Sequence, residues 1–257
     1  MSTPLILITN DDGYNAKGIT SLVNAVKDFG EILIVAPDKP QSGMGHAITV
    51  NDPIRCYETT QFKNIKAYCC TGTPVDCIKM GMFLLKDRKP DYILSGINHG
   101  SNVSTNVLYS GTMSAAVEGA LEGVPSIGFS LTNYDPDANF SPSIKYVKAI
   151  FRTLIENNMK KGTCLNVNIP AVEENEIMGI KVCKQGRAFW DDTFDQRTDP
   201  FGNKYYWLTG SFGSKEKDEN SDIYYLENNY ITIVPTQFDM TCYESIKEIN
   251  QWKLDEI

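Results

Sequence analysis

Short apolar runs and helix-length amphipathic segments alternate through the first 170 residues, and this alternation restricts the possible fold more than any other feature. The runs at residues 5–9 and 31–36 consist mainly of aliphatic and β-branched residues, a composition typical of buried strands. Between them, residues 17–29 carry apolar side chains at the period of an α-helix. Such alternation predicts an α/β fold, with a mostly parallel sheet and helices on both of its faces.

The same pattern continues along the chain. Thr73 and Pro74 are typical of a helix N-cap and of the first helical position, and the helix that they begin is predicted to reach Leu85. Further strands are predicted at residues 90–95, 126–130 and 164–169, and further helices at residues 113–123 and 141–157. These elements continue the alternation expected of a mostly parallel sheet with helices on both faces.

The C-terminal part differs in composition, because aromatic residues and glycines dominate residues 188–213. A strand is predicted at 204–209, an exposed polar segment at 214–221, a strand at 230–234 that ends before Pro235, and a helix at 242–252. We therefore predict an α/β catalytic core of residues 1–185. A β-rich extension of residues 186–257 would carry a protruding hairpin used in oligomerisation. A loop region that packs its aromatic residues against its own core is the alternative.

The charge balance narrows the class of partner. With 24 basic and 32 acidic residues the formal net charge is −8, which argues against a nucleic-acid or membrane-surface binder. A small anionic substrate is compatible with this charge if a metal ion supplies positive charge locally. The seven cysteines form no disulfide framework, and the sequence shows neither a signal peptide nor a transmembrane segment. We expect reduced thiols and a cytoplasmic location.

Two adjacent carboxylates, Asp11 and Asp12, follow the first predicted strand directly. The carboxyl ends of parallel strands form the edge where doubly wound folds bind ligands, and two like charges there call for a cation. Asp followed by Gly13 is equally typical of a turn or a helix cap. Taken alone, the pair is compatible with both interpretations.

Three further polar segments, residues 37–46, 95–102 and 109–112, also follow predicted elements of the sheet and can converge on the carboxylates. They would complete an oxygen-only ligand set of two Asp, a Ser hydroxyl and an Asn carbonyl, which hard cations such as Mg²⁺, Mn²⁺ or Ca²⁺ prefer. The segment Ser110-Gly111-Thr112 begins a predicted helix, where hydroxyls and backbone N–H groups form either an anion site or a simple cap. An anion site beside a hard cation indicates phosphate chemistry.

Six motifs in one order resemble the SurE family, the stationary-phase survival proteins that act as 5′/3′-nucleotidases. The resemblance is strong over residues 5–130 and weaker afterwards. The motifs are Asn10-Asp11-Asp12-Gly13, Ala36-Pro37 with Gln41-Ser42-Gly43, Gly72-Thr73-Pro74 with Asp76-Cys77, Ser95-Gly96-Ile97-Asn98 with Gly100 and Asn102, Tyr109-Ser110-Gly111-Thr112, and Ala115-Ala116 with Glu118-Gly119.

The resemblance implies a Rossmann-like core and a homodimer or homotetramer built through the C-terminal extension. It also implies metal-dependent hydrolysis of nucleoside 5′- and 3′-monophosphates with one divalent cation, Mg²⁺ or Mn²⁺. The metal ligands carry over to Asp11, Asp12, Ser42 and Asn98, and the phosphate contacts to Asn98, Ser110, Gly111 and Thr112. The chain departs from the family at Ser104, where glycine is usual, and at Thr105, where an acidic residue is common. These departures bear on substrate preference more than on metal binding.

The expected reaction is metal-assisted hydrolysis at the two catalytic carboxylates, Asp11 and Asp12, with Asp12 as a general base and Ser110 and Thr112 holding the phosphate. An Asp nucleophile that forms a phosphoenzyme is the alternative. His46 and His99 are candidate acids, although loop histidines more often serve packing or solvation. A hydrolase of short polyphosphate and a non-catalytic nucleotide sensor are the alternative functions.

Overall fold

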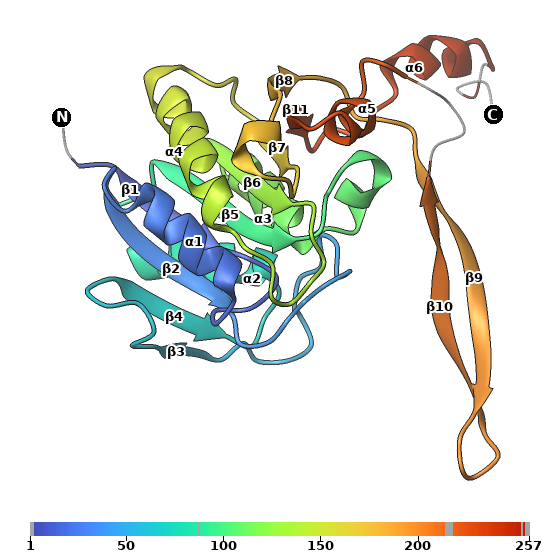
Figure 1. The fold of residues 1–257 in the computed structure, drawn as a ribbon, viewed down its shortest axis with the longest axis horizontal. Coiled ribbons are helices and arrows are strands. Elements are labelled where there is room, and N and C mark those ends of the chain that lie inside the picture. Colours follow the sequence, from blue (N-terminus) through green and yellow to red (C-terminus); the bar gives the residue numbers. More distant parts are fainter. Residues whose placement is uncertain (1–2, 87, 214–217, 253, 255–257) are drawn as a thin grey trace.

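The structure, a computed structural model, describes residues 3–86, 88–213, 218–252 and 254, and it is built around one nine-stranded sheet (Figure 1). The strand order is β3-β4-β2-β1-β5-β6-β7-β11-β8. Neighbours from β4 to β7 run parallel, whereas β3 pairs antiparallel with β4 and β11 pairs antiparallel with β7. The predicted Rossmann-like, mostly parallel sheet is confirmed.

The central strands and the four long helices agree with the sequence pattern to within a few residues. The strands are β1 (Leu5–Thr9), β2 (Glu31–Pro37), β5 (Tyr92–His99), β6 (Ser126–Leu131) and β7 (Thr163–Ile169). The helices are α1 (Lys17–Val26), α2 (Pro74–Leu85), α3 (Gly111–Leu121) and α4 (Ser141–Glu156). Helices α1 and α4 pack side by side, as do α2 and α3.

Strand β1 shows how both faces of the sheet are buried. All five of its residues are buried, and successive side chains point to opposite faces. Ile6 and Ile8 join the apolar cluster that contains residues of α1 and α4. Leu7 joins the cluster that contains residues of α2 and α3. Two-sided burial explains why the strand is a continuous apolar run rather than an alternating one.

Helix α2 begins as its sequence predicts. The Thr73 hydroxyl accepts a hydrogen bond from the Asp76 N–H (3.1 Å), and the Asp76 carboxylate accepts one from the Thr73 N–H (2.9 Å). This capping box satisfies two backbone donors that the first turn would otherwise leave unpaired. Pro74 then occupies the first turn, where a missing N–H costs nothing.

Four strands were absent from the sequence prediction: β3 (Cys56–Glu58), β4 (Lys66–Cys70), β8 (Gly179–Val182) and β9 (Phe189–Thr198), the last of which was implied only by the predicted hairpin. Both β3 and β8 are short edge strands with exposed residues. They are held by pairing with a neighbour and not by a strong local apolar pattern. Strand β5 is longer than predicted, since it continues through Asn98 to His99 with a register shift between Ser95 and Asn98.

Strand β11 (Tyr230–Gln237) also corrects a prediction, because it passes through Pro235 instead of ending before it. The Ile233 carbonyl accepts a hydrogen bond from the Cys183 N–H on the β8 side. Pro235, two residues further along, faces the same side beyond the end of β8. No strand there requires the N–H that proline lacks, so the strand can continue.

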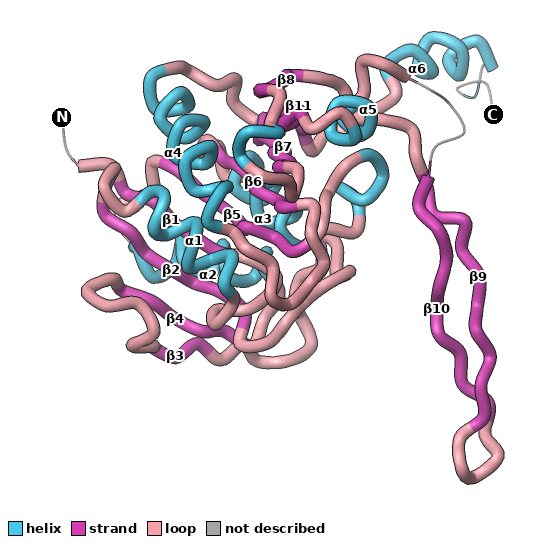
Figure 2. The backbone as a smooth tube through the Cα atoms, in the orientation of Figure 1, coloured by secondary structure: helices cyan, strands magenta, loops and turns pink. Residues whose placement is uncertain are grey.

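The C-terminal extension contains an antiparallel hairpin, β9 (Phe189–Thr198) and β10 (Lys204–Gly213), which projects from the core as a separate arm (Figure 2). Most of its residues are exposed, so the predicted protruding hairpin is confirmed and the alternative of a loop packed on its own core is wrong. Strand β11 returns to the central sheet. The division into a core of residues 1–185 and an extension of residues 186–257 stays a prediction.

The remaining elements are short. They are α5 (Asp222–Glu227), α6 (Tyr243–Ile249) and three 3₁₀ turns at Ser104–Leu108, Glu174–Glu176 and Asn250–Trp252. Helix α6 and the turn after it cover the helix predicted at 242–252. Of the polar segment 214–221, residues 214–217 lie outside the described residues. Ser221 is buried as the N-cap of α5, contrary to the exposed position predicted for it.

None of the helices in the described part of the chain has the length and apolar character needed to cross a membrane. All seven cysteines are free thiols.

Candidate active site

A cavity of about 870 Å³ opens at the carboxyl edge of the sheet. Its walls come from the ends of β1 and β5, the loop after β2, the N-terminus of α3 and the root of the β9–β10 hairpin. Four of the predicted site residues line it: Asp11, Ser42, Asn98 and Ser110. Asp12, Gly111 and Thr112 lie next to these residues in the chain but outside the lining.

Asp11 is held against the first turn of α3. The Thr112 hydroxyl donates a short hydrogen bond to its carboxylate, and the Asp11 carbonyl accepts one from the Gln41 N–H (2.7 Å). The side chain is only 4% exposed. A Cβ at Gly111 would lie 2.7 Å from the Asp11 Cβ, so only glycine lets the helix approach this closely.

Asp12 is less deeply buried, and one of its carboxylate oxygens accepts a hydrogen bond from the His99 N–H (3.1 Å). This bond connects the ends of the neighbouring strands β1 and β5. Burial raises the pKa of Asp12 to about 6. Burial and the adjacent Asp12 carboxylate raise the pKa of Asp11 to about 7, against the lowering effect of the Thr112 hydrogen bond. The pair therefore has a strong preference for a compensating positive charge.

The chemistry of the donor set fits a hard divalent cation. The Asn98 amide nitrogen donates to the Gly100 carbonyl (2.8 Å), so its side-chain oxygen is the atom left to face a cation. Ser42 is exposed on the cavity wall. Among the described residues no three His, Cys, Asp or Glu side chains form a metal-binding group. A cation at this edge would thus need two carboxylates supplemented by neutral oxygens, the ligand type that Mg²⁺ and Mn²⁺ accept.

Two buried polar atoms beside the carboxylates have no hydrogen-bond partner within the described part of the chain. They are the side-chain oxygen of Asn10 and Nδ1 of His99. Buried polar groups are normally paired, so such atoms next to two acids are consistent with a hydrated or ion-binding edge.

The loop after β5 is fixed by a buried amide network. The Asn102 N–H donates to the Asn168 side chain (2.7 Å), and the Asn166 amide donates to the Asn102 carbonyl (2.7 Å). The Asn102 amide in turn donates to the Ser130 hydroxyl (2.8 Å). Because these partners lie on β6 and β7, the loop that follows Asn98 is anchored to two neighbouring strands.

The residues of the segment Ser110-Gly111-Thr112 differ in their surroundings, since Ser110 faces the cavity and Thr112 is buried behind it. Ser110 is the N-cap of α3, accepts a hydrogen bond from the Met113 N–H (3.0 Å) and lines the cavity. Thr112 is fully buried, with its hydroxyl engaged by Asp11. The direct phosphate contacts predicted for Gly111 and Thr112 stay predictions. The contact that the structure does show is the hydrogen bond by which the Thr112 hydroxyl holds the Asp11 carboxylate.

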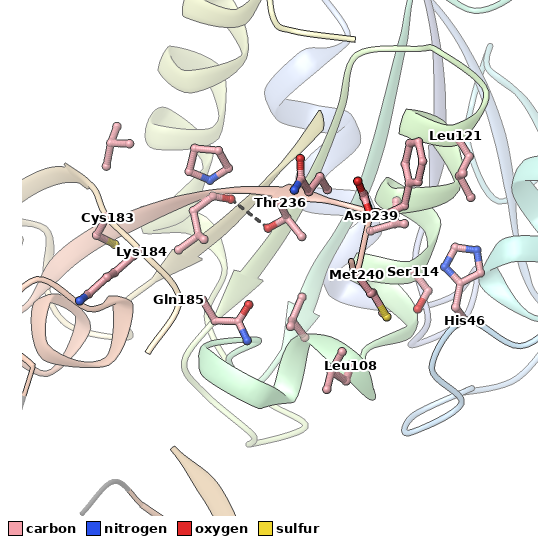
Figure 3. Close-up of a pocket in the computed structure, with 17 residues that line it drawn as sticks. His46, Leu108, Ser114, Leu121, Cys183, Lys184, Gln185, Thr236, Asp239 and Met240 are labelled. Atoms are coloured by element: carbon pink, nitrogen blue, oxygen red, sulfur yellow. Dashed lines mark hydrogen bonds between the residues drawn. The ribbon is translucent and has the colours of Figure 1, made fainter. Parts of the chain in front are cut away.

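The two histidines are far from equivalent. His46 lies 2.9 Å from the Glu118 carboxylate and lines a second cavity, of about 970 Å³, between α3 and the segment after β11 (Figure 3). His99 lines the candidate site and packs edge-on against Phe140, with ring centroids 4.8 Å apart. Burial lowers the pKa of His99 below its usual value, so its ring is neutral at pH 7.

Sequence reasoning missed the contribution of the hairpin root, since Phe189, Trp190 and Leu208 also line the cavity. The density of aromatic residues in 188–213 was visible, but nothing in the local pattern placed them beside the carboxylates.

We expect Thr112→Val to lower phosphatase turnover or metal affinity by roughly 10–100-fold, the usual cost of removing a group that orients a metal ligand. Valine matches threonine in shape but cannot donate to Asp11. Thr112→Ser, which keeps the hydroxyl, serves as the matched control. Steady-state kinetics over a series of metal concentrations checks this, and equal activity of the valine and serine variants would contradict it.

Comparison with known proteins gives a consistent result. The family model described as "Survival protein SurE" matches residues 6–192. A protein named 5′-nucleotidase SurE from Christiangramia forsetii is 51% identical over 256 residues, covering 98% of each chain, and one of the same name from Flavobacterium johnsoniae is 49% identical, with the same coverage. The crystal structure of the SurE protein from Aquifex aeolicus superposes with a TM-score of 0.83 at 35% identity, covering 97% of this chain and 100% of that one.

Proposed function

The chain belongs to the SurE family, and from that premise we propose that it is a 5′-nucleotidase that hydrolyses nucleoside monophosphates to nucleoside and phosphate with the help of a divalent metal ion. The observation that carries the metal-dependent part is the Asp11–Asp12 pair at the carboxyl edge of the sheet, with Asp11 buried and Asp12 partly buried, together with the Asn98 and Ser42 oxygens. Two carboxylates with raised pKa values form a poor site for an anionic substrate unless a cation is present, since no Lys or Arg is found among the described residues that line the cavity.

We assign Asp11, Asp12, Ser42 and Asn98 as the residues that would hold Mg²⁺ or Mn²⁺. When bound there, the ion would polarise a phosphoryl oxygen and lower the pKa of a water molecule. Asp12 is assigned as the general base, because it is the less buried of the two carboxylates and its pKa of about 6 leaves it mostly ionised at neutral pH, whereas Asp11, with a pKa of about 7, is about half protonated there. Asp11 is fixed by Thr112 and serves to position the site.

The phosphate group is assigned to the N-terminus of α3, where Ser110 faces the cavity. Helix α3 extends over eleven residues, so its first backbone N–H groups offer partial positive charge to an anion. The position beside Asp11 suits the equatorial oxygens of a phosphoryl group, whose charge these donors would stabilise in the transition state.

The proposal extends to 3′-monophosphates, to a cytoplasmic location and to a homodimer or homotetramer. Exposed apolar side chains on the last helices support the oligomer: Tyr243, Ile246, Ile249 and Trp252 are all exposed. Among the described elements, the one with substantial contact to α6 is the 3₁₀ turn after it. An apolar helix left uncovered in one chain is typical of an interface between chains.

The test is a substrate panel with Mn²⁺ or Mg²⁺ in excess. We expect phosphate release from AMP, with weaker release from 3′-AMP and from short polyphosphate. Preferential hydrolysis of polyphosphate would favour the alternative enzyme. Tight AMP binding without turnover under any of the metals would instead favour a nucleotide sensor and overturn the proposed activity.

A further inference from the structure

The candidate cavity has two chemically different ends. One end carries the oxygen donors Asp11, Ser42, Asn98 and Ser110. The other end is formed by the hairpin, where Phe189 and Trp190 at its root and Leu208 further along β10 supply apolar surface beside Asp192. A nucleoside monophosphate is divided in the same way, with a dianionic phosphate at one end and a flat aromatic base at the other.

The Trp190 side chain at that end is held by two contacts. Its indole N–H donates to the Asn106 side chain (2.8 Å), a residue of the 3₁₀ turn Ser104–Leu108 that also lines the cavity. The Phe212 ring lies 5.5 Å away from the opposite strand of the hairpin and supports the indole. Trp190 is nevertheless 42% exposed, so part of its ring surface can still be covered by a ligand.

Hydrogen bonds fix the hairpin root against the same turn. The Ser104 hydroxyl pairs with the backbone of Ala188, accepting from its N–H (2.7 Å) and donating to its carbonyl (3.0 Å). The Thr105 hydroxyl donates to the same carbonyl (2.7 Å). Ala188 is fully buried and lies two residues before Trp190. Both hydroxyl residues of this turn therefore hold the hairpin root.

Asp222 also joins the 3₁₀ turn to the segment before the hairpin. Its fully buried carboxylate accepts hydrogen bonds from the Ser104 N–H and the Gly186 N–H, each at 2.8 Å. Ser104 has a positive φ of 53°, a strained conformation for a residue other than glycine. The bonds to Asp222 and Ala188 hold it there, so the turn, the hairpin root and α5 form one rigid unit beneath Trp190.

We propose that Trp190 is the stacking platform for the nucleobase, so that the hairpin root makes this enzyme select nucleotides over other phosphate monoesters. This proposal rests on the proposed nucleotidase function. Stacking of a base on an aromatic side chain tolerates every base, and the platform therefore selects for the presence of a base rather than for its identity. A cavity of about 870 Å³ is within the range that holds small organic ligands.

The experiment compares AMP with ribose 5-phosphate, which keeps the sugar and phosphate but lacks the base. We expect the wild-type protein to prefer AMP in kcat/KM, and Trp190→Ala to reduce that preference by roughly 10-fold, as expected for the loss of one stacked base. The loss should be in KM for AMP, with kcat and all constants for ribose 5-phosphate unchanged. Trp190→Phe, which keeps a ring, should recover most of the preference.

Trp207→Ala is the matched control. Trp207 lies on β10 of the same hairpin, pairs with Asp195, and is exposed outside the cavity lining. We expect this variant to keep the wild-type preference. Because ribose 5-phosphate uses the same catalytic groups, a variant with a distorted site would lose both substrates together and would be recognised as misfolded in its circular dichroism spectrum.

Each remaining outcome decides the question. The platform is overturned if Trp190→Ala leaves the preference intact, if Trp207→Ala removes it equally, or if a folded Trp190→Ala protein loses both substrates alike. It is also overturned if alanine at Tyr109, Tyr134 or Phe189, the other exposed rings among the described lining residues, removes the preference instead. A wild-type protein that hydrolyses both substrates equally would end the base subsite but keep the phosphatase. Hydrolysis of neither would end the proposed function itself.

Discussion

Replacing Asp11 by asparagine is expected to reduce phosphate release from AMP by at least about 10²–10³-fold, on the scale of removing one electrostatic group from an active site. Asparagine keeps the size of the side chain and an oxygen that can accept from the Thr112 hydroxyl. It removes the negative charge, and with it the strongest ligand type in the predicted metal set. The fold should persist, because Asp11 contributes no apolar contact to the core clusters.

The same substitution is expected to stabilise the metal-free protein. In the wild-type protein, burial and the Asp12 carboxylate hold the pKa of Asp11 at about 7, so ionising this side chain at neutral pH opposes folding. Removing the charge should raise the free energy of unfolding, by at most about 4 kcal/mol for a shift of this size. Thermal unfolding in EDTA at pH 7.5 measures it. A gain in stability with a loss of turnover would separate a functional charge pair from a structural one.

Asp38→Asn is the control for both effects. Asp38 follows β2 at the same edge of the sheet, is exposed, and is absent from the cavity lining. We expect the activity and stability of the Asp38→Asn variant to match those of the wild-type protein. Near-normal turnover of Asp11→Asn with saturating Mn²⁺ or Mg²⁺ would refute the assignment of Asp11 to the metal set.

Removal of divalent metal is expected to have the second large effect, with EDTA reducing AMP hydrolysis to background and Mn²⁺ or Mg²⁺ restoring it. The reason is electrostatic, because the two carboxylates would repel a phosphate dianion without a cation between them. Zn²⁺ should restore less activity, since the predicted ligand set of Asp11, Asp12, Ser42 and Asn98 contains neither His nor Cys. Full activity after exhaustive chelation would show that the reaction does not depend on metal.

The pH dependence of stability provides a readout that does not involve turnover. Both carboxyl groups have a higher pKa in the folded protein than the usual 3.8, about 7 for Asp11 and about 6 for Asp12. The folded state therefore binds protons more tightly than the unfolded one. The tighter proton binding by these two carboxyl groups stabilises the fold fully below about pH 4, and this stabilisation is lost as the pH rises through 6 and 7.

Bound metal should reverse this trend, because it requires the ionised carboxylates. At a metal concentration near 100-fold the dissociation constant we expect the melting temperature to rise by about 5 °C at pH 8, with a smaller rise at pH 5. Asp11→Asn should show little rise at either pH. An equal metal-induced shift at both pH values would indicate binding elsewhere on the protein.

The fold of the core could be predicted because its signals are local. Each central strand is buried on both faces and reads as an apolar run, and each helix carries its own period or cap, as Thr73 does. The edge strands β3 and β8 were missed because pairing with a neighbour stabilises them. The path of β11 through Pro235 depended on where β8 ends, which no local pattern encodes.

The candidate site was predictable to the extent that topology brings strand ends together. Asp11, Ser42, Asn98 and Ser110 are up to 99 positions apart in the chain, and the parallel sheet places them around one cavity. Their roles as ligands and phosphate contacts stay predictions. His46 could not be separated from His99 in the sequence, although the structure pairs His46 with Glu118 on a different cavity.

By itself the sequence determined the α/β class and the carboxylate pair at the end of β1, since both depend on the order of residue types along short segments. Only the tertiary structure decided that Thr112 supports Asp11. It alone also decided that the hairpin root, fixed through Ser104, Ala188 and Asp222, places Trp190 on the cavity wall. These contacts join residues about 80 to 120 positions apart, and their existence depends on how packed elements meet, which the periodicity of a single segment does not contain.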